Sequence, residues 1–293
     1  MIHTVGVVGG GLMGAGIAEV AARAGLTTYI REVSPHLASH AIASIEKSMS
    51  RAVQRGKLTA DARTAALANL SSGTDLVPAA AADILIEAVV EDLEVKNALW
   101  REANAMARPE TIFASNTSSL TIAAMAVPSG RPDRIVGLHF FSPVPVMPLV
   151  EVVRTVGTTD ATMDTVLAFA AQLGKTAVVA KDTSGFIVNR LLVPYMLDAV
   201  RAIEQGVGST TDIDLAMHLG TGHPMGPLTL LDFVGLDTTY RIAEIMFTEY
   251  RDPRFAPPPL LKRMVLVGWL GRKSRRGFYD YTSEPPTPTD LGV

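Results

Sequence analysis

Apolar residues up to about position 180 fall into two alternating kinds of segment. Short runs rich in β-branched residues are separated by longer stretches in which apolar residues recur at helical spacing. The predicted strands are 4–8, 26–30, 83–90, 111–114, 134–141, 149–154 and 176–180. The predicted helices are 15–24, 35–56, 59–70, 94–107, 120–125 and 161–173. This alternation predicts an α/β fold with a Rossmann-type, doubly wound and mostly parallel sheet.

The pattern changes after residue 182, where the spacing of apolar residues becomes helical only. The predicted helices are 183–206, 212–219, 227–247 and 259–267. Ser184 is the expected N-cap of the first of them, Gly206 its stop, and Pro194 a kink in its middle. The tail after Ser283 is low in complexity and is expected to fray. We therefore predict a Rossmann domain over 1–182 and an all-α C-terminal domain over 183–293.

A glycine-rich loop connects the first predicted strand to the first predicted helix. The first glycine permits a tight turn, the second lets the backbone approach a pyrophosphate, and the third lets the helix pack on the strand. The N-terminus of the helix then faces the phosphates. The loop positions predicted to contact a dinucleotide are Gly9, Gly11, Leu12, Met13 and Gly14.

An acidic residue ends the second predicted strand, since Glu32 follows Gly9 by 23 positions. A carboxylate there accepts hydrogen bonds from the adenosine ribose, which completes the context that the glycine pattern requires. The alternative interpretation is a glycine-rich turn with no ligand, followed by a carboxylate that is only solvated. The carboxylate repels a 2′-phosphate, so NAD is favoured over NADP. Arg31 beside it softens this preference, and NADP stays the alternative cofactor.

Composition narrows the class of protein without adding chemistry. The 293 residues carry a formal net charge of -3, are 48% hydrophobic and include no cysteine. This charge gives no reason to expect nucleic acid as a partner, and the absence of cysteine excludes disulfides and thiolate catalysis. The chain has no signal-peptide pattern and no apolar run long enough to span a bilayer. We expect a cytoplasmic protein with no membrane partner and no metal site.

Oxidation of an alcohol requires a base for the hydroxyl proton while a hydride leaves for the nicotinamide. Histidine suits this role because its pKa lies near neutrality. Among the six histidines, His139 follows an apolar strand, at the sheet edge where doubly wound folds place their ligands. A histidine in such a position is more often a satisfied member of the core. The position alone therefore leaves both interpretations open.

Four separate segments resemble the signature motifs of the L-3-hydroxyacyl-CoA dehydrogenase family. They are ASNTSSL at 114–120, GLHFFSPVPVMPLVE at 137–151, GFIVNR at 185–190 and RGFY at 276–279. The resemblance covers essentially the whole chain, whose length is closer to that of the standalone 3-hydroxybutyryl-CoA dehydrogenases than to multifunctional β-oxidation proteins. It implies an NAD-dependent two-domain enzyme that oxidises (S)-3-hydroxyacyl-CoA to 3-oxoacyl-CoA. It also implies a homodimer formed through the helical domain.

The resemblance implies roles for individual residues. His139 matches the catalytic base of the family, and Glu151 matches its partner carboxylate. The proline-rich turn between them lets the chain double back, so that Glu151 would fix the ring tautomer and stabilise the imidazolium. Ser118 and Asn189 match neutral donors near the 3-oxygen of the substrate. Without the resemblance, Ser118 would be interpreted as a helix-start residue and Asn189 as a helix-surface amide.

Further positions match family contacts to the cofactor or to CoA. The additional cofactor contacts implied are Glu91, Lys96, Ser118, Ser142 and Lys273. The CoA contacts implied are Ser48, Arg55 and Lys57, where basic groups suit a phosphorylated anion. Ser142 stands where the family usually has asparagine, which weakens a nicotinamide or substrate contact. Pro148 stands where lysine is frequent, so both departures bear on substrate preference rather than on the reaction class.

Other interpretations stay open. A hydroxyacid dehydrogenase of the gulonate type shares the histidine–glutamate arrangement but would lack acyl-CoA contacts. The 3-hydroxyisobutyrate type resembles a lysine-based chemistry on the first helix of the second domain, and residues 183–205 contain no lysine. A non-catalytic, crystallin-like relative would not need the complete set of His139, Glu151, Ser118 and Asn189.

Overall fold

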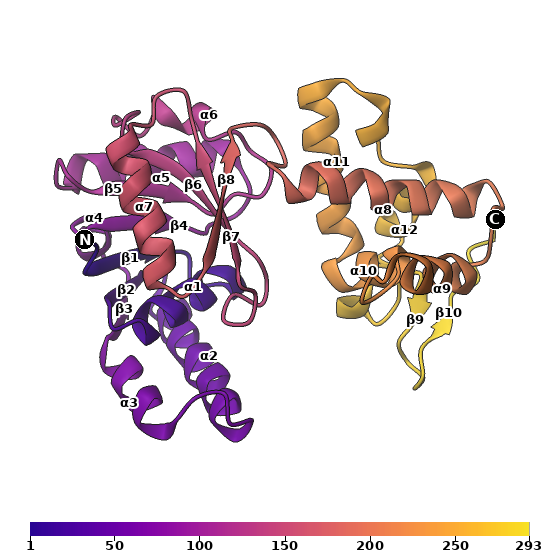
Figure 1. Cartoon of the computed structure of the whole chain (residues 1–293), viewed down its shortest axis with the longest axis horizontal. Coiled ribbons are helices and arrows are strands. Elements are labelled where there is room, and N and C mark those ends of the chain that lie inside the picture. Colours follow the sequence, from indigo (N-terminus) through magenta and orange to yellow (C-terminus); the bar gives the residue numbers. More distant parts are fainter. Residues whose placement is uncertain (293) are drawn as a thin grey trace. The chain divides into compact units, whose positions relative to one another are not determined.

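The computed structural model describes residues 1–292, which form two compact units, Met1–Phe186 and Ile187–Val293 (Figure 1). Val293, the last position of the predicted helical domain, lies outside the described residues. The first unit contains the alternating strands and helices, and the second contains the helical region. The division therefore follows the change of pattern along the sequence.

An eight-stranded sheet forms the centre of the first unit, with the strand order β3-β2-β1-β4-β5-β6-β7-β8. Neighbouring strands are parallel except β6 and β7, which are antiparallel. The strands are β1 (Thr4–Val8), β2 (Thr27–Arg31), β3 (Leu70–Gly73), β4 (Ile84–Glu87), β5 (Ile112–Ser115), β6 (Ile135–Phe140), β7 (Leu149–Arg154) and β8 (Thr176–Lys181). The direction of winding reverses between β1 and β4, the switch point where doubly wound sheets bind ligands.

Helices cover both faces of this sheet. They are α1 (Leu12–Arg23), α2 (Pro35–Gln54), α3 (Ala60–Ala68), α4 (Val77–Ala80), α5 (Leu93–Met106), α6 (Ala123–Ala126) and α7 (Asp160–Gln172). One apolar core joins the sheet to α1, α2 and α7, and a second joins it to α4, α5 and α6. Along β4, Ile84 and Ile86 lie in the first core and Leu85 in the second. This period of two on a sheet covered on both faces confirms the predicted doubly wound fold.

The same alternation decides the direction of the predicted base. Leu138 of β6 and Val150 and Val152 of β7 lie in the core that includes α1. His139 and Glu151 therefore project from the opposite face of the sheet, toward the side of α5. A shift of one residue in either strand would place the two side chains on different faces.

The sequence pattern does not predict two elements that lie between residues 70 and 80. β3 (Leu70–Gly73) begins at the last residue of the segment 59–70 expected to be helical, and α4 (Val77–Ala80) is a single turn. β3 reads LSSG and pairs with β2 at the edge of the sheet. It has no apolar alternation because its order comes from pairing with β2 rather than from a buried face of its own.

The second unit is helical around its own apolar core. Its elements are α8 (Val188–Glu204), α9 (Thr210–Thr221), α10 (Pro227–Val234), α11 (Leu236–Tyr250), the short turn η1 (Pro253–Phe255), α12 (Pro259–Leu266), the turn η2 (Arg272–Ser274), and the antiparallel pair β9 (Tyr279–Asp280) and β10 (Thr287–Pro288). The predicted helical domain is confirmed, with one short strand pair added. Within residues 1–292, no helix combines the length and apolar character needed to cross a membrane.

Three local expectations for this region are wrong. Ser184 is not the N-cap of α8, because the helix begins at Val188, four residues later, with Ile187 at the N-cap position. The stretch 227–247 is two helices, which are separated at Gly235 with a φ of 103°. The tail does not fray immediately after Ser283, since β10 pairs with β9 and the backbone N–H of Thr289 donates to Phe278.

Candidate active site

The glycine-rich loop lies at the switch point of the sheet, between β1 and α1. Gly9 has a φ of 95°, and a Cβ there would lie 2.6 Å from the carbonyl oxygen of Ala88, just after β4. A Cβ on Gly11 would have no neighbour within 4 Å, so this side of the loop is open. Leu12 and Met13 begin α1, and no described side chain caps the helix there. The first N–H groups of α1 are therefore suited to a pyrophosphate, which these residues fit.

Glu32 lies just after β2, beside the same loop. Its Oε1 accepts a hydrogen bond from the N–H of Gly10 at 2.5 Å, and its Oε2 accepts one from the N–H of Val33 at 3.0 Å. These bonds hold the carboxylate next to the loop, where a dinucleotide presents its adenosine ribose. The neighbouring Arg31 donates to the carbonyl of Thr74 at 3.3 Å. The glycine-rich loop therefore binds the carboxylate of Glu32 and not the guanidinium of Arg31.

His139 and Glu151 form a buried pair across β6 and β7. The ring nitrogen Nδ1 lies 2.7 Å from Oε2 of Glu151. His139 is 6% exposed and Glu151 is 1% exposed, so little water screens the interaction. A carboxylate on Nδ1 favours the tautomer that carries its proton there, which leaves Nε2 as the nitrogen for proton exchange with a ligand.

Two aromatic rings flank the His139 imidazole. The ring of Phe141 lies 4.5 Å from it between centroids and that of Phe186 lies 5.6 Å from it, both tilted. Phe186 is buried and has a φ of 48°, which is uncommon for a residue other than glycine. The two rings limit the access of water to the imidazole.

The segment that follows β5 connects this pair to Ser118. The side-chain oxygen of Asn116 accepts a hydrogen bond from the N–H of Phe140 at 2.9 Å, directly after His139. The end of β5 is thereby tied to the end of β6. Ser118 lies two residues beyond Asn116, half-buried, in the loop between β5 and α6. Its position therefore depends on how that loop is held.

Glu91 holds this loop. Its Oε1 accepts hydrogen bonds from the Thr117 hydroxyl at 2.5 Å and from the Ser118 N–H at 3.0 Å. Burial by itself raises the pKa of Glu91, but the Lys96 ammonium and the Thr117 hydroxyl outweigh it and hold the pKa below its ordinary value. The carboxylate is therefore ionised at neutral pH and serves as an acceptor for the loop.

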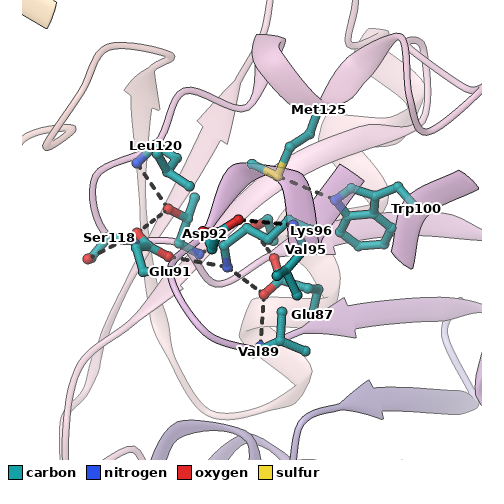
Figure 2. A network of polar contacts seen from close by, with 12 residues as sticks. Glu87, Val89, Glu91, Asp92, Val95, Lys96, Trp100, Ser118, Leu120 and Met125 are labelled. Carbon is teal, nitrogen blue, oxygen red and sulfur yellow. Dashed lines mark hydrogen bonds and ion pairs between the residues drawn. The ribbon is translucent and has the colours of Figure 1, made fainter. Parts of the chain in front are cut away.

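Lys96 lies between two carboxylates, as Figure 2 shows. Its Nζ is 2.5 Å from Oε1 of Glu87 and 3.2 Å from Oε2 of Glu91. The side chain is 1% exposed. Two of the charged residues implied to contact the cofactor therefore have structural contacts here: Lys96 lies in the interior, and Glu91 holds a loop.

The residues implied to contact CoA lie on a different part of the first unit. Ser48 is half-buried within α2, and Arg55 and Lys57 are exposed at the C-terminal end of that helix. Ser142 is exposed in the turn between β6 and β7. The exposure of Arg55 and Lys57 leaves both cations accessible to a phosphorylated anion.

Two implied site residues belong to the second unit. Asn189 is the second residue of α8. Lys273 lies in η2, where its Nζ is 2.5 Å from a carboxylate oxygen of Asp237. The structure therefore pairs Lys273 within its own unit, on a side chain that is 48% exposed.

Sequence reasoning missed three residues around the His139 pair and the Ser118 loop. Glu87 interrupts an otherwise apolar strand, and a charge in a strand buried on both faces is a signal that could have found it. Asn116 lies inside a motif that resembles the family, but its contact with Phe140 depends on the pairing of β5 with β6. Phe186 lies inside the GFIVNR motif, but its contact with His139 joins positions far apart in the sequence, so the motif does not reveal it.

A nicotinamide-dependent dehydrogenase needs a loop for the pyrophosphate and a base near the carboxyl ends of the strands. The first unit has a loop suited to a pyrophosphate and a buried histidine–carboxylate pair at that end of the sheet, as this class of protein requires. Residues 4–183 match the family described as 3-hydroxyacyl-CoA dehydrogenase, NAD binding domain, and residues 185–281 match its C-terminal domain. The chain belongs to the 3-hydroxyacyl-CoA dehydrogenase family and is an NAD-dependent oxidoreductase.

Individual relatives are similar in sequence to this chain over nearly its full length. A 3-hydroxybutyryl-CoA dehydrogenase from Mycobacterium tuberculosis is 49% identical over 282 residues, which cover 96% of this chain and 99% of the relative. One from Bradyrhizobium diazoefficiens is 44% identical and covers 99% of each chain. The crystal structure of (S)-3-hydroxybutyryl-CoA dehydrogenase from Ralstonia eutropha superposes with a TM-score of 0.93 at 40% identity, over 97% of this chain and 100% of that one.

Proposed function

We propose that this chain interconverts short-chain (S)-3-hydroxyacyl-CoA, such as 3-hydroxybutyryl-CoA, and 3-oxoacyl-CoA. The observation that carries the proposal is the buried pair in which His139 Nδ1 lies 2.7 Å from Glu151 Oε2. The names of the relatives from M. tuberculosis and B. diazoefficiens support the choice of a short acyl chain.

In this proposal His139 is the catalytic base. In the oxidative direction Nε2 accepts the proton of the 3-hydroxyl as the C3 hydride leaves the substrate. NAD, when bound, supplies the acceptor for that hydride. Glu151 stabilises the imidazolium that forms and keeps the ring oriented. The reverse direction returns the proton from Nε2 to the carbonyl oxygen, so the same pair serves reduction.

Ser118 and Asn189 are the proposed donors to the 3-oxygen of the substrate. A hydroxyl and an amide can polarise a ketone without competing for the proton that His139 transfers. The proposal for Ser118 is supported by the loop contacts that fix its backbone, including the 3.0 Å bond from its N–H to Glu91. The proposal for Asn189 is supported by its position in the GFIVNR motif.

The remaining assignments concern the ligands. The proposed cofactor contacts are Gly9, Gly11, Leu12, Met13, Gly14, Glu32, Glu91, Lys96, Ser118, Ser142 and Lys273. The proposed CoA contacts are Ser48, Arg55 and Lys57. Open space beside Gly11 and the carboxylate of Glu32 support a dinucleotide whose ribose carries no 2′-phosphate.

A homodimer formed through the second unit is proposed from its surface. Several large apolar side chains are exposed there, including Leu191, Val207, Leu219, Leu266 and Val267. These side chains are the apolar surface that the proposed dimer contact would cover. The cytoplasm stays the predicted compartment.

The test is the reduction of acetoacetyl-CoA with NADH, followed at about 340 nm, the absorbance band of NADH, with C4 and longer acyl chains compared. His139→Gln is expected to lower kcat by about a hundredfold or more, because it removes the base. Retention of most activity would refute the assignment of the base. Turnover of free hydroxyacids alone would instead favour the gulonate-type alternative.

A further inference from the structure

Two oppositely charged side chains lie almost completely inside the first unit, where no step of the proposed reaction uses them. Glu87 at the end of β4 is 0% exposed and Lys96 on α5 is 1% exposed, with 2.5 Å between Oε1 and Nζ. Figure 2 shows both beneath the loop that carries Ser118. Removing such charges from water is costly, and the attraction between them does not by itself make the pair stabilising. Their placement therefore needs an explanation other than the strength of the ion pair.

Glu87 is bonded on both carboxylate oxygens. Oε2 accepts the hydroxyl of Ser115 at 2.6 Å, and Oε1 accepts the N–H of Val89 at 2.9 Å in addition to Lys96. The N–H of Asn116 also donates to the backbone carbonyl of Glu87 at 2.8 Å. The residue thus ties the carboxyl end of β4 to the carboxyl end of β5, where the Ser118 loop begins.

Lys96 carries this constraint to the other side of the loop. Its Nζ holds Oε2 of Glu91 at 3.2 Å, so Oε1 of Glu91 is directed to the Thr117 hydroxyl and the Ser118 N–H. The loop is therefore held at its start by Glu87 and along its length by Glu91. Lys96 connects the two carboxylates.

We propose that Glu87 and Lys96 are positioning residues that set the location of Ser118 for the reaction. Glu87 and Lys96 act through Ser115 and Glu91, which contact the loop directly. In this proposal neither Glu87 nor Lys96 touches substrate. The inference rests on the proposed role of Ser118 and adds a second role, as a support of the loop, to the cofactor contact proposed for Lys96.

A double-mutant cycle tests the inference. Glu87→Gln, Ser118→Ala and the double variant are compared in steady-state reduction of acetoacetyl-CoA by NADH. Glu87→Gln is expected to lower kcat about tenfold with the substrate KM within about twofold, and Ser118→Ala to lower kcat about a hundredfold. The kcat of the double variant is expected to equal that of Ser118→Ala, because Glu87 affects the reaction only by positioning the Ser118 hydroxyl, which is absent in both variants.

Each result has a separate meaning. Multiplicative losses in the double variant would overturn the positioning role while leaving Ser118 as a donor. Unchanged kcat in Ser118→Ala would overturn both the proposed role of Ser118 and the inference. Ser115→Ala is the second variant if Glu87→Gln fails to fold, since it removes only the hydroxyl that donates to Glu87. It is expected to show the same lack of additivity with Ser118→Ala.

Asp232→Asn is the matched control. Asp232 is a carboxylate that is 1% exposed in the second unit, where it accepts the N–H groups of Phe278 and Tyr279. Its substitution is expected to lower the melting temperature and to combine multiplicatively with Ser118→Ala in kcat. A lack of additivity for this control as well would show a general loss of structure and would overturn the inference.

Discussion

His139 and Glu151 stand directly opposite each other across β6 and β7, and 2.7 Å separates Nδ1 from Oε2. β6 and β7 are the only antiparallel neighbours in the described sheet of the first unit. Directly paired residues of antiparallel strands project from the same face with their Cβ atoms close together. The turn that reverses the chain after β6 therefore creates the pair.

Replacing Glu151 with Gln is expected to lower kcat by about a hundredfold. The amide keeps the shape of the side chain but cannot stabilise the imidazolium that forms in the oxidative direction. Steady-state oxidation of 3-hydroxybutyryl-CoA measures the effect, and NADH affinity measured separately by fluorescence should stay unchanged. A kcat within about threefold of the native value would argue against a catalytic role for the pair.

Gly11 and Gly14 are expected to respond differently to alanine. A Cβ on Gly11 meets nothing within 4 Å, whereas one on Gly14 would lie 1.7 Å from the carbonyl oxygen of Gly9. Gly11→Ala should therefore keep its melting temperature and raise the KM for NADH about tenfold, because the methyl group enters the space for the pyrophosphate. Gly14→Ala should lower stability by about 1–3 kcal/mol through overpacking. Equal melting temperatures for the two variants would contradict this distinction.

Glu32 is expected to set the preference for NADH over NADPH. Glu32→Gln removes the charge that repels a 2′-phosphate, so the ratio of kcat/KM for NADH to that for NADPH should fall about tenfold. Initial rates with each cofactor at fixed acetoacetyl-CoA measure the ratio. Glu110→Gln, at an exposed carboxylate after α5, should leave it unchanged. An unaltered ratio in Glu32→Gln would place cofactor discrimination elsewhere.

Asp83 is expected to contribute stability at neutral pH that is lost in acid. Burial favours its neutral form, but hydrogen bonds from the His3 N–H, Arg108 and the Thr4 N–H outweigh this and lower its pKa to about 2 from 3.8. A lowered folded-state pKa stabilises the fold above the unfolded pKa and ceases to do so as the pH falls through the folded one.

The variant Asp83→Asn is thus expected to be less stable by about 1–2 kcal/mol at pH 7, with the difference reduced to roughly half at pH 3. Urea unfolding at both pH values, followed by circular dichroism, measures it. A difference that is the same at both pH values would show that the charge of Asp83 is not responsible.

Local periodicity was sufficient to predict the alternating strands and helices, the doubly wound sheet and the helical second region. It failed where order comes from a distant partner, as in β3, whose LSSG sequence becomes a strand by pairing with β2. It also failed where one residue interrupts a continuous pattern, as Gly235 does between α10 and α11. Both failures reflect contacts or backbone angles that hydrophobic spacing does not encode.

The sequence by itself determined the family, and it predicted the dinucleotide loop and the pairing of His139 with Glu151, because these depend on residue types at fixed spacing. Only the tertiary structure decided that Lys96 lies between Glu87 and Glu91 rather than at the surface, and that two phenyl rings flank His139. A charged residue at a helix start looks the same in the sequence whether water or two carboxylates surround it. Burial and ion pairing arise when strands distant in the chain become neighbours, which is a property of the sheet and not of any one segment.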